Sequence, residues 1–179
     1  MPTVSQASTA RPFKRPLLFL DFEASSLAPG SWPVEIGYAW FADGRVVTRA
    51  VLIEPRTGWS MADWSDDAAR IHGIPLEHIR AGESADAVAA ETDAFADYDV
   101  VSDNPVWEQR WLDRLRAGRG ARIEVLPLRV AIRDRLDEHA AGSVSRTLLR
   151  QASPHRAGPD AARLAEAWLG AIRSYSIAA

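Results

Sequence analysis

An uninterrupted apolar segment, Leu17–Leu20, runs directly into Asp21, Phe22 and Glu23. Consecutive apolar residues predict a strand that is buried on both faces. Side chains two positions apart in a strand point to the same face, so Asp21 and Glu23 should lie together at its carboxyl end. Two neighbouring carboxylates repel each other, and a cation or a proton has to compensate. A hard divalent cation such as Mg²⁺ suits ligands that are all oxygen.

The remaining hydrophobic pattern predicts further strands that are followed by alternating helices and strands. Asp43-Gly44 is a typical hairpin turn between strands at residues 34–41 and 45–53. Two further strands are predicted at residues 99–103 and 123–126. Helices are predicted over 63–72, 84–96, 105–116, 129–139 and 145–151, and from 158 onward. This order is typical of an α/β domain with a mixed sheet.

The length of 179 residues fits one domain. Residues 1–15 are polar, contain proline and lack acidic groups, which predicts a disordered tail before a single domain at 16–179. The chain has no cysteine, which excludes disulfides, thiolate metal sites and a cysteine nucleophile. The apolar runs are far shorter than the ~20 residues of a membrane span, and no signal-peptide core is visible. We therefore expect a cytoplasmic protein with no membrane partner.

The distribution of charge along the chain is uneven, although the net charge is only -3. Residues 59–103 carry two basic and eleven acidic groups, whereas residues 104–179 carry thirteen basic and eight acidic groups. The C-terminal segment therefore either presents a basic surface to a polyanion or forms ordinary solvated helix faces.

Two other segments place acidic groups where they could join the first pair. Asp103 ends a predicted strand, and Glu108 follows one turn into the next helix. Ligands in open α/β sheets bind where strands end and helices begin. Asp160 lies in the first turn of the last helix, where the helix dipole favours a carboxylate, and His155 precedes it in a loop. These residues could flank one site, although a loop histidine alone is more often a surface residue.

Three sequence segments together resemble the DEDD superfamily of 3′-5′ exonucleases, histidine subtype. They are DFE at 21–23, NPVWEQRWL at 104–112 and HRAGPDA at 155–161. The proofreading epsilon subunit, oligoribonuclease and ribonuclease T belong to this superfamily. VEIGYAWF and AARIHGI are also similar to family segments, so the resemblance spans residues 17–168. It implies a ribonuclease H-like fold with a mixed five-stranded sheet, its first three strands antiparallel, flanked by helices.

The resemblance also implies an activity and a set of functional residues. The enzyme would hydrolyse the 3′-terminal phosphodiester of single-stranded RNA or DNA and release nucleoside monophosphates, using two Mg²⁺ or Mn²⁺ ions. The expected metal ligands are Asp21, Glu23, Glu108 and Asp160. The expected general base is His155. The residues expected to contact the terminal nucleotide are Ala24, Ser25, Ser26 and Leu27. A homodimer is common among small relatives.

One position differs from the family pattern, which has an aspartate where this chain has Glu108. The longer side chain could place its carboxylate differently or weaken the second metal position. Three hypotheses therefore stay open: an active exonuclease, an exonuclease-fold domain that only binds nucleic acid or a partner, and a hydrolase of very short oligonucleotides. Neither the preference for DNA or RNA nor the oligomeric state follows from the sequence.

Overall fold

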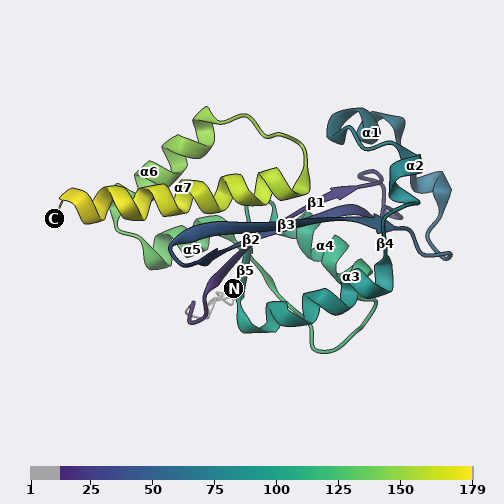
Figure 1. The fold of residues 1–179 in the computed structure, drawn as a ribbon, viewed down its shortest axis with the longest axis horizontal. Helices are drawn as coiled ribbons and strands as arrows, with labels where there is room; N and C mark the ends of the chain where they lie inside the picture. The colour runs from purple at the N-terminus through teal and green to yellow at the C-terminus, as the bar shows by residue number, and fades with distance from the viewer. Residues whose placement is uncertain (1–12, 179) are drawn as a thin grey trace, which may run out of the picture.

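The computed structural model describes residues 13–178 and shows one mixed sheet between helical layers (Figure 1). The strands lie in the order β4-β3-β2-β1-β5-β6. Their bounds are β1 Leu17–Ala24, β2 Pro33–Ala42, β3 Arg45–Glu54, β4 Glu83–Ser84, β5 Asp99–Ser102 and β6 Val125–Pro127. The helices are α1 Asp66–His72, α2 Leu76–Ile79, α3 Ala85–Glu91, α4 Pro105–Arg116, α5 Leu128–Arg135, α6 Glu138–Arg150 and α7 Ala157–Ala178, with 3-10 turns η1 Met61–Asp63 and η2 Thr92–Asp97.

The predicted mixed α/β class is confirmed, and β1, β2 and β3 pair antiparallel as expected. The sheet has six strands rather than five, because Glu83 and Ser84 pair in parallel with the end of β3. Asp43 and Gly44 both have positive φ, which is the conformation of a type I′ hairpin turn. The helix predicted at 129–139 ends at Arg135, and Asp137 then caps a new helix, α6, through the amide of Ala140.

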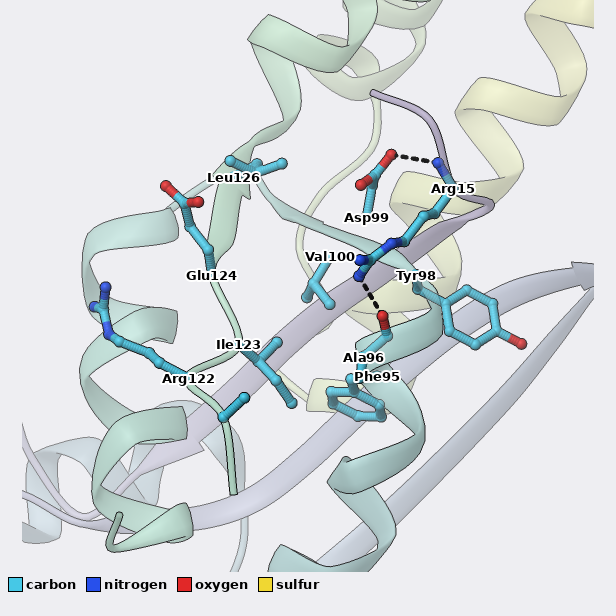
Figure 2. A pocket seen from close by; sticks show the side chains of 11 residues that line it. Arg15, Phe95, Ala96, Tyr98, Asp99, Val100, Arg122, Ile123, Glu124 and Leu126 are labelled. Atoms are coloured by element: carbon cyan, nitrogen blue, oxygen red, sulfur yellow. Dashed lines mark hydrogen bonds between the residues drawn. The ribbon is translucent and has the colours of Figure 1, made fainter. Parts of the chain in front are cut away.

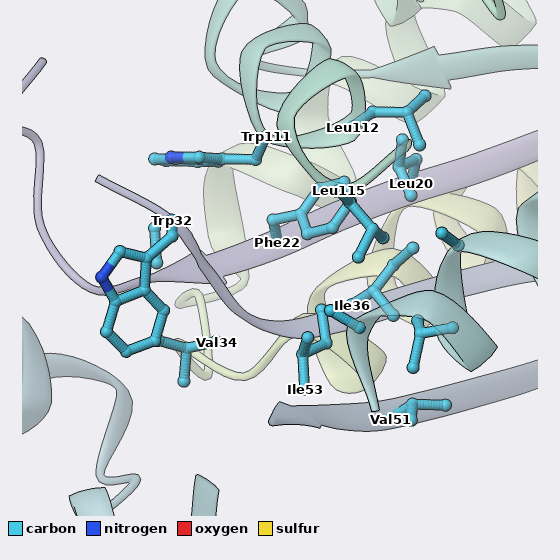
Figure 3. Packing of buried hydrophobic residues seen from close by; sticks show 14 of the residues in the cluster. Leu20, Phe22, Trp32, Val34, Ile36, Val51, Ile53, Trp111, Leu112 and Leu115 are labelled. Carbon is cyan, nitrogen blue, oxygen red and sulfur yellow. The ribbon is translucent and has the colours of Figure 1, made fainter. Parts of the chain in front are cut away.

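Each face of the sheet is covered by different helices. Leu18, Leu20 and Phe22 point to the face covered by α3 and α4, where Trp32, Ile36 and Leu112 pack with them (Figure 3). Leu17 and Phe19 point to the opposite face and pack under α7 and α5. The helix α6 lies against α7, outside this second layer. None of the helices within residues 13–178 combines the length and apolarity that a membrane crossing requires.

The N-terminal residues that the structure describes are attached to the domain. The backbone N–H of Arg15 donates to Asp99 at 2.8 Å, and its guanidinium donates to the carbonyl of Ala96 (Figure 2). Phe13 packs against the cluster under α7. Contacts with the domain therefore begin before residue 16, within the segment that we predicted as tail. The rest of that predicted tail, residues 1–12, lies outside the described residues.

The start of α7 lies directly on β2. A Cβ atom added to Gly37 would be 2.0 Å from the backbone carbon of Ala157, and one added to Gly158 would be 2.7 Å from the Cβ of Ala50. These separations are shorter than van der Waals contact, so only glycine permits this approach. Gly37 pairs with Asp21 across β1 and β2, so α7 begins beside the first of the strand acids.

We expect Gly37→Ala to destabilise the protein, because its methyl group would overlap the α7 backbone. Overpacking of this kind costs roughly 1–3 kcal/mol, and each kcal/mol lowers the Tm of a chain of this size by about 2–4 °C. Thermal unfolding followed by circular dichroism measures the effect. Gly58→Ala is the matched control, since a Cβ there meets open space. Equal Tm values for the two variants would contradict the close packing.

Candidate active site

The two acids of β1 continue the strand face that α7 covers. Leu17 and Phe19 pack in the core beneath α7, and Asp21 and Glu23 follow on the same face of the strand. Phe22 between them points into the opposite core. The alternation predicted from the sequence therefore places both carboxylates on one face, at the end of the strand.

Asp160 brings a third carboxylate to these two. One oxygen from each of Asp21, Glu23 and Asp160 lies within 4.8 Å of the others. Asp160 is buried and fixed by several donors: the Ser153 hydroxyl at 2.8 Å, the Arg156 amide at 3.1 Å and Arg163 Nε at 3.2 Å. Acids separated by 139 residues in the chain thus share one site.

Glu108 faces this group from α4 on the other side of β1. Its side chain is 3% exposed, and the backbone N–H of Phe22 donates to its carboxyl group. Within the part of the chain that the structure describes, its Oε2 atom has no hydrogen-bond partner. A buried acceptor without a partner is unfavourable, and a bound cation or a proton would satisfy it. Glu108 is not a member of the group formed by Asp21, Glu23 and Asp160, although the charges of Asp21 and Asp103 act on its carboxyl group.

The pKa values of these carboxyls are raised. Burial raises the pKa of Asp21 to about 9, with added repulsion from Glu23, Asp160 and Asp103. Burial, then Asp160 and Glu35, raise the pKa of Glu23 to about 7. The pKa of Glu108 is also raised, chiefly by burial and then by Asp21. Without a metal ion, protons must therefore neutralise much of this cluster at neutral pH.

A divalent cation fits the donor set better than protons do. The acids offer only carboxylate oxygens, which are the preferred ligands of Mg²⁺ and Mn²⁺. Arg163 contacts Asp160 at 3.2 Å and Asp103 at 3.4 Å, and the charge of Arg156 acts on Glu23. Arg156 is itself paired with Glu35, so the acids still outnumber the guanidinium groups around them.

His155 lies on the loop between α6 and α7. The residue is exposed, has a φ of 53°, and its backbone N–H donates to the Ser153 hydroxyl at 3.3 Å. It is not a member of the group formed by Asp21, Glu23 and Asp160. Its neighbours Ser153 and Arg156 both bind Asp160, so the loop that carries the imidazole is attached to the acid cluster.

The segment after Glu23 forms a turn with mixed exposure. Ala24 is buried, and the fully buried Ser25 uses its hydroxyl to accept the Trp32 amide at 3.1 Å. Ser25 therefore closes the turn, and its hydroxyl is occupied. Ser26 is half-buried, and Leu27 is 69% exposed. These last two residues are the ones that a ligand at this turn could contact.

Sequence reasoning missed two polar residues at the site, Glu35 and Arg163. Glu35 is almost completely buried in β2, where it binds Arg156. The available signal was an acid inside the apolar segment VEIG, because a charge in a central strand needs a partner. Arg163 is one helical turn after Asp160, a spacing at which side chains interact.

Two tryptophans that lie in or near loops, Trp32 and Trp59, are buried and stacked on each other.

Comparison with known proteins shows similarity in structure. No family model matches the sequence, and no curated protein matches it. The structure of E. coli Exonuclease I with a dA16 oligonucleotide matches with a TM-score of 0.63 at 15% identity, covering 92% of this chain and 42% of that one. The structure of S. pombe Pop2p in its Mg²⁺- and Mn²⁺-bound form matches with a TM-score of 0.61 at 12% identity. The match covers 91% of this chain and 84% of that one.

Exonuclease X in complex with 5′ overhanging duplex DNA is similar to the chain over most of both lengths. The TM-score is 0.53 and the identity 22%, with 89% of this chain and 93% of that chain covered. The chain spans less than half of Exonuclease I and 65% of cell-death related nuclease 4, another similar structure. The chain therefore shares the fold of these exonuclease structures, which is the ribonuclease H-like fold expected from its three motifs.

We expect the metal-free protein to lose stability as the pH rises toward 9. The folded protein holds protons on Asp21 and Glu23 that the unfolded chain releases near its ordinary pKa values of 3.8 and 4.5. The stability that this protonation contributes is fully present below the pKa values of the unfolded chain. It is lost as the pH rises through the pKa values of the folded protein, which are about 7 for Glu23 and about 9 for Asp21. Asp21→Asn cannot ionise there and should flatten the decline.

Melting temperatures between pH 5 and 9.5 in EDTA measure this dependence. The exposed Asp134→Asn is the control and should follow the wild type. If Asp21→Asn and the wild type gave parallel curves, the acid cluster would not be the source of the decline.

Proposed function

We propose that the chain is a metal-dependent 3′-5′ exonuclease acting on single-stranded RNA or DNA. The observation that carries this proposal is the convergence of Asp21, Glu23 and Asp160, with the unpartnered Oε2 of the buried Glu108 beside them. The fold shared with Exonuclease I and Exonuclease X supports the same assignment, because those structures are exonucleases and hold DNA.

In this proposal Asp21, Glu23 and Asp160 would hold the divalent ions, and Glu108 would support them. When bound, such an ion pair polarises the phosphate and stabilises charge on the attacking and leaving oxygens. His155 would accept a proton from the attacking water as the general base.

The substrate would approach the turn after β1. Leu27 exposes an apolar side chain that can pack on a terminal base. The half-buried Ser26 accepts the Ala28 amide at 3.3 Å, which leaves its hydroxyl hydrogen to donate to a substrate. The excess of basic groups in residues 104–179 supports a polyanionic partner. A homodimer remains a proposal that analytical ultracentrifugation would test.

A second candidate function is a domain that binds nucleic acid or a partner without cleaving. Arg163 favours it, because its guanidinium already contacts Asp160 and Asp103 and partly neutralises the site. The two functions differ in their response to metal. An active site built for cations gains stability from Mn²⁺, whereas a site adapted to its own arginine does not.

We expect the purified chain to shorten end-labelled single-stranded DNA or RNA stepwise from the 3′ end with Mn²⁺, and to be inert in EDTA. Asp160→Asn should lower the rate by about a hundredfold or more. Loss of a residue that only hydrogen-bonds to a metal ligand typically lowers activity by about 10–100-fold. Gel analysis of products reports polarity. Absence of cleavage of polymers and dinucleotides alike by the wild type would favour the binding domain.

The role of Glu108 has its own prediction. Glu108→Gln keeps the shape of the side chain but removes its charge, so the Mn²⁺ concentration for half-maximal activity should rise by about tenfold or more. The Mn²⁺-induced increase in Tm should shrink in parallel. A Mn²⁺ dependence like that of the wild type would mean that the buried carboxyl is structural.

A further inference from the structure

Glu35 is a buried carboxylate next to the site that the proposed chemistry does not use. It lies in β2 directly opposite Glu23 of β1. Its side chain is 3% exposed, comparable to that of Glu108. A buried charge requires strong partners, and those partners show what the residue does.

All three donors to Glu35 come from the start of α7 and the residue before it. Arg156 donates from Nε at 3.0 Å and from Nη2 at 2.6 Å, and the backbone N–H of Ala157 donates at 2.9 Å. The arginine contacts both carboxylate oxygens in the two-point arrangement that fixes orientation best. Glu35 lies outside the group formed by Asp21, Glu23 and Asp160, and its donors belong to the residues that begin α7, so we assign it to holding the loop.

The loop between α6 and α7 is also attached to Asp160. The Ser153 hydroxyl and the Arg156 amide both donate to this carboxylate, and the His155 amide donates back to Ser153. His155 therefore lies between two anchored points. Its left-handed φ of 53° is unfavourable for a residue other than glycine and persists only where the surrounding contacts impose it.

We propose that the Glu35–Arg156 pair positions the loop that carries His155 relative to the acids of β1. This inference rests on the proposed exonuclease function. Glu35 and Arg156 are positioning residues, because they act through His155, whereas Asp160 is also held by Ser153 and Arg163. Their loss should leave the metal ligands in place and misplace the imidazole, which lowers the rate of the chemical step more than substrate affinity. A misplacement of about 1 Å can lower a rate by about a hundredfold.

The experiment compares Glu35→Gln, Arg156→Gln, the double variant and Arg156→Lys with the wild type. On a labelled single-stranded oligonucleotide with Mn²⁺, kcat should fall by about tenfold to a hundredfold in each Gln variant, with KM changed less than about twofold. The double variant should be no worse than either single one, since both remove the same interaction. Arg156→Lys keeps the positive charge at this position, so its kcat should lie between that of Arg156→Gln and that of the wild type. The Mn²⁺-induced rise in Tm should persist throughout.

A second readout is independent of activity. Amide hydrogen exchange at Ala157 should be faster in Glu35→Gln, because the amide loses its charged acceptor. Glu91→Gln is the control, since Glu91 also holds an arginine, Arg49, at two points, with distances of 2.8 and 2.6 Å, on the other side of the sheet. It should change neither kcat nor exchange at Ala157.

Three results would overturn the inference: a rise in KM alone, a fall in kcat no larger than that of Glu91→Gln, or unchanged exchange at Ala157. A wild type that cleaves nothing would overturn the proposed function instead. In that case exchange at Ala157 still decides whether Glu35 holds the loop.

Discussion

The close approach of α7 to β2 is the constraint on which the site depends. Because Gly37 has no side chain, Ala157 and Gly158 lie directly on the strand, and the first turn of α7 reaches the edge where β1 ends. That turn carries Asp160, and the preceding loop carries His155. A larger residue at position 37 would lift the helix end away from the strand acids. The position of the helix, more than any single hydrogen bond, therefore assembles the acid cluster.

The second constraint is charge. Asp21, Glu23, Glu108 and Asp160 are held together although each is partly or fully buried, which is unfavourable for an isolated protein. Arg163 offsets part of the repulsion, while burial and the neighbouring acids raise the pKa values of Asp21 and Glu23 and so favour their protonated forms. In the proposed function, the acids that destabilise the metal-free protein would become favourable around a cation.

The sequence predicted those features that depend on local pattern. The apolar run ending in acids placed Asp21 and Glu23 on one strand face, and Asp43-Gly44 predicted the hairpin turn. Features set by tertiary contacts were missed. A two-residue strand such as Glu83–Ser84 has no periodicity to detect, and the hydroxyl of Ser25 is engaged by Trp32 through a turn that the sequence does not reveal. The partner of Glu35 is 121 residues away, so only the fold identifies it.

The glutamate at position 108 lies on α4, and its carboxyl group accepts the backbone N–H of Phe22 in β1. Its Oε2 atom is buried and has no hydrogen-bond partner among the described residues. The charge of Asp21 acts on this carboxyl group. The nearby Asp103 is already engaged by Arg163. In the proposed function, the unpartnered Oε2 is the atom that Glu108 can offer to a cation, so a glutamate at this position is compatible with that proposal.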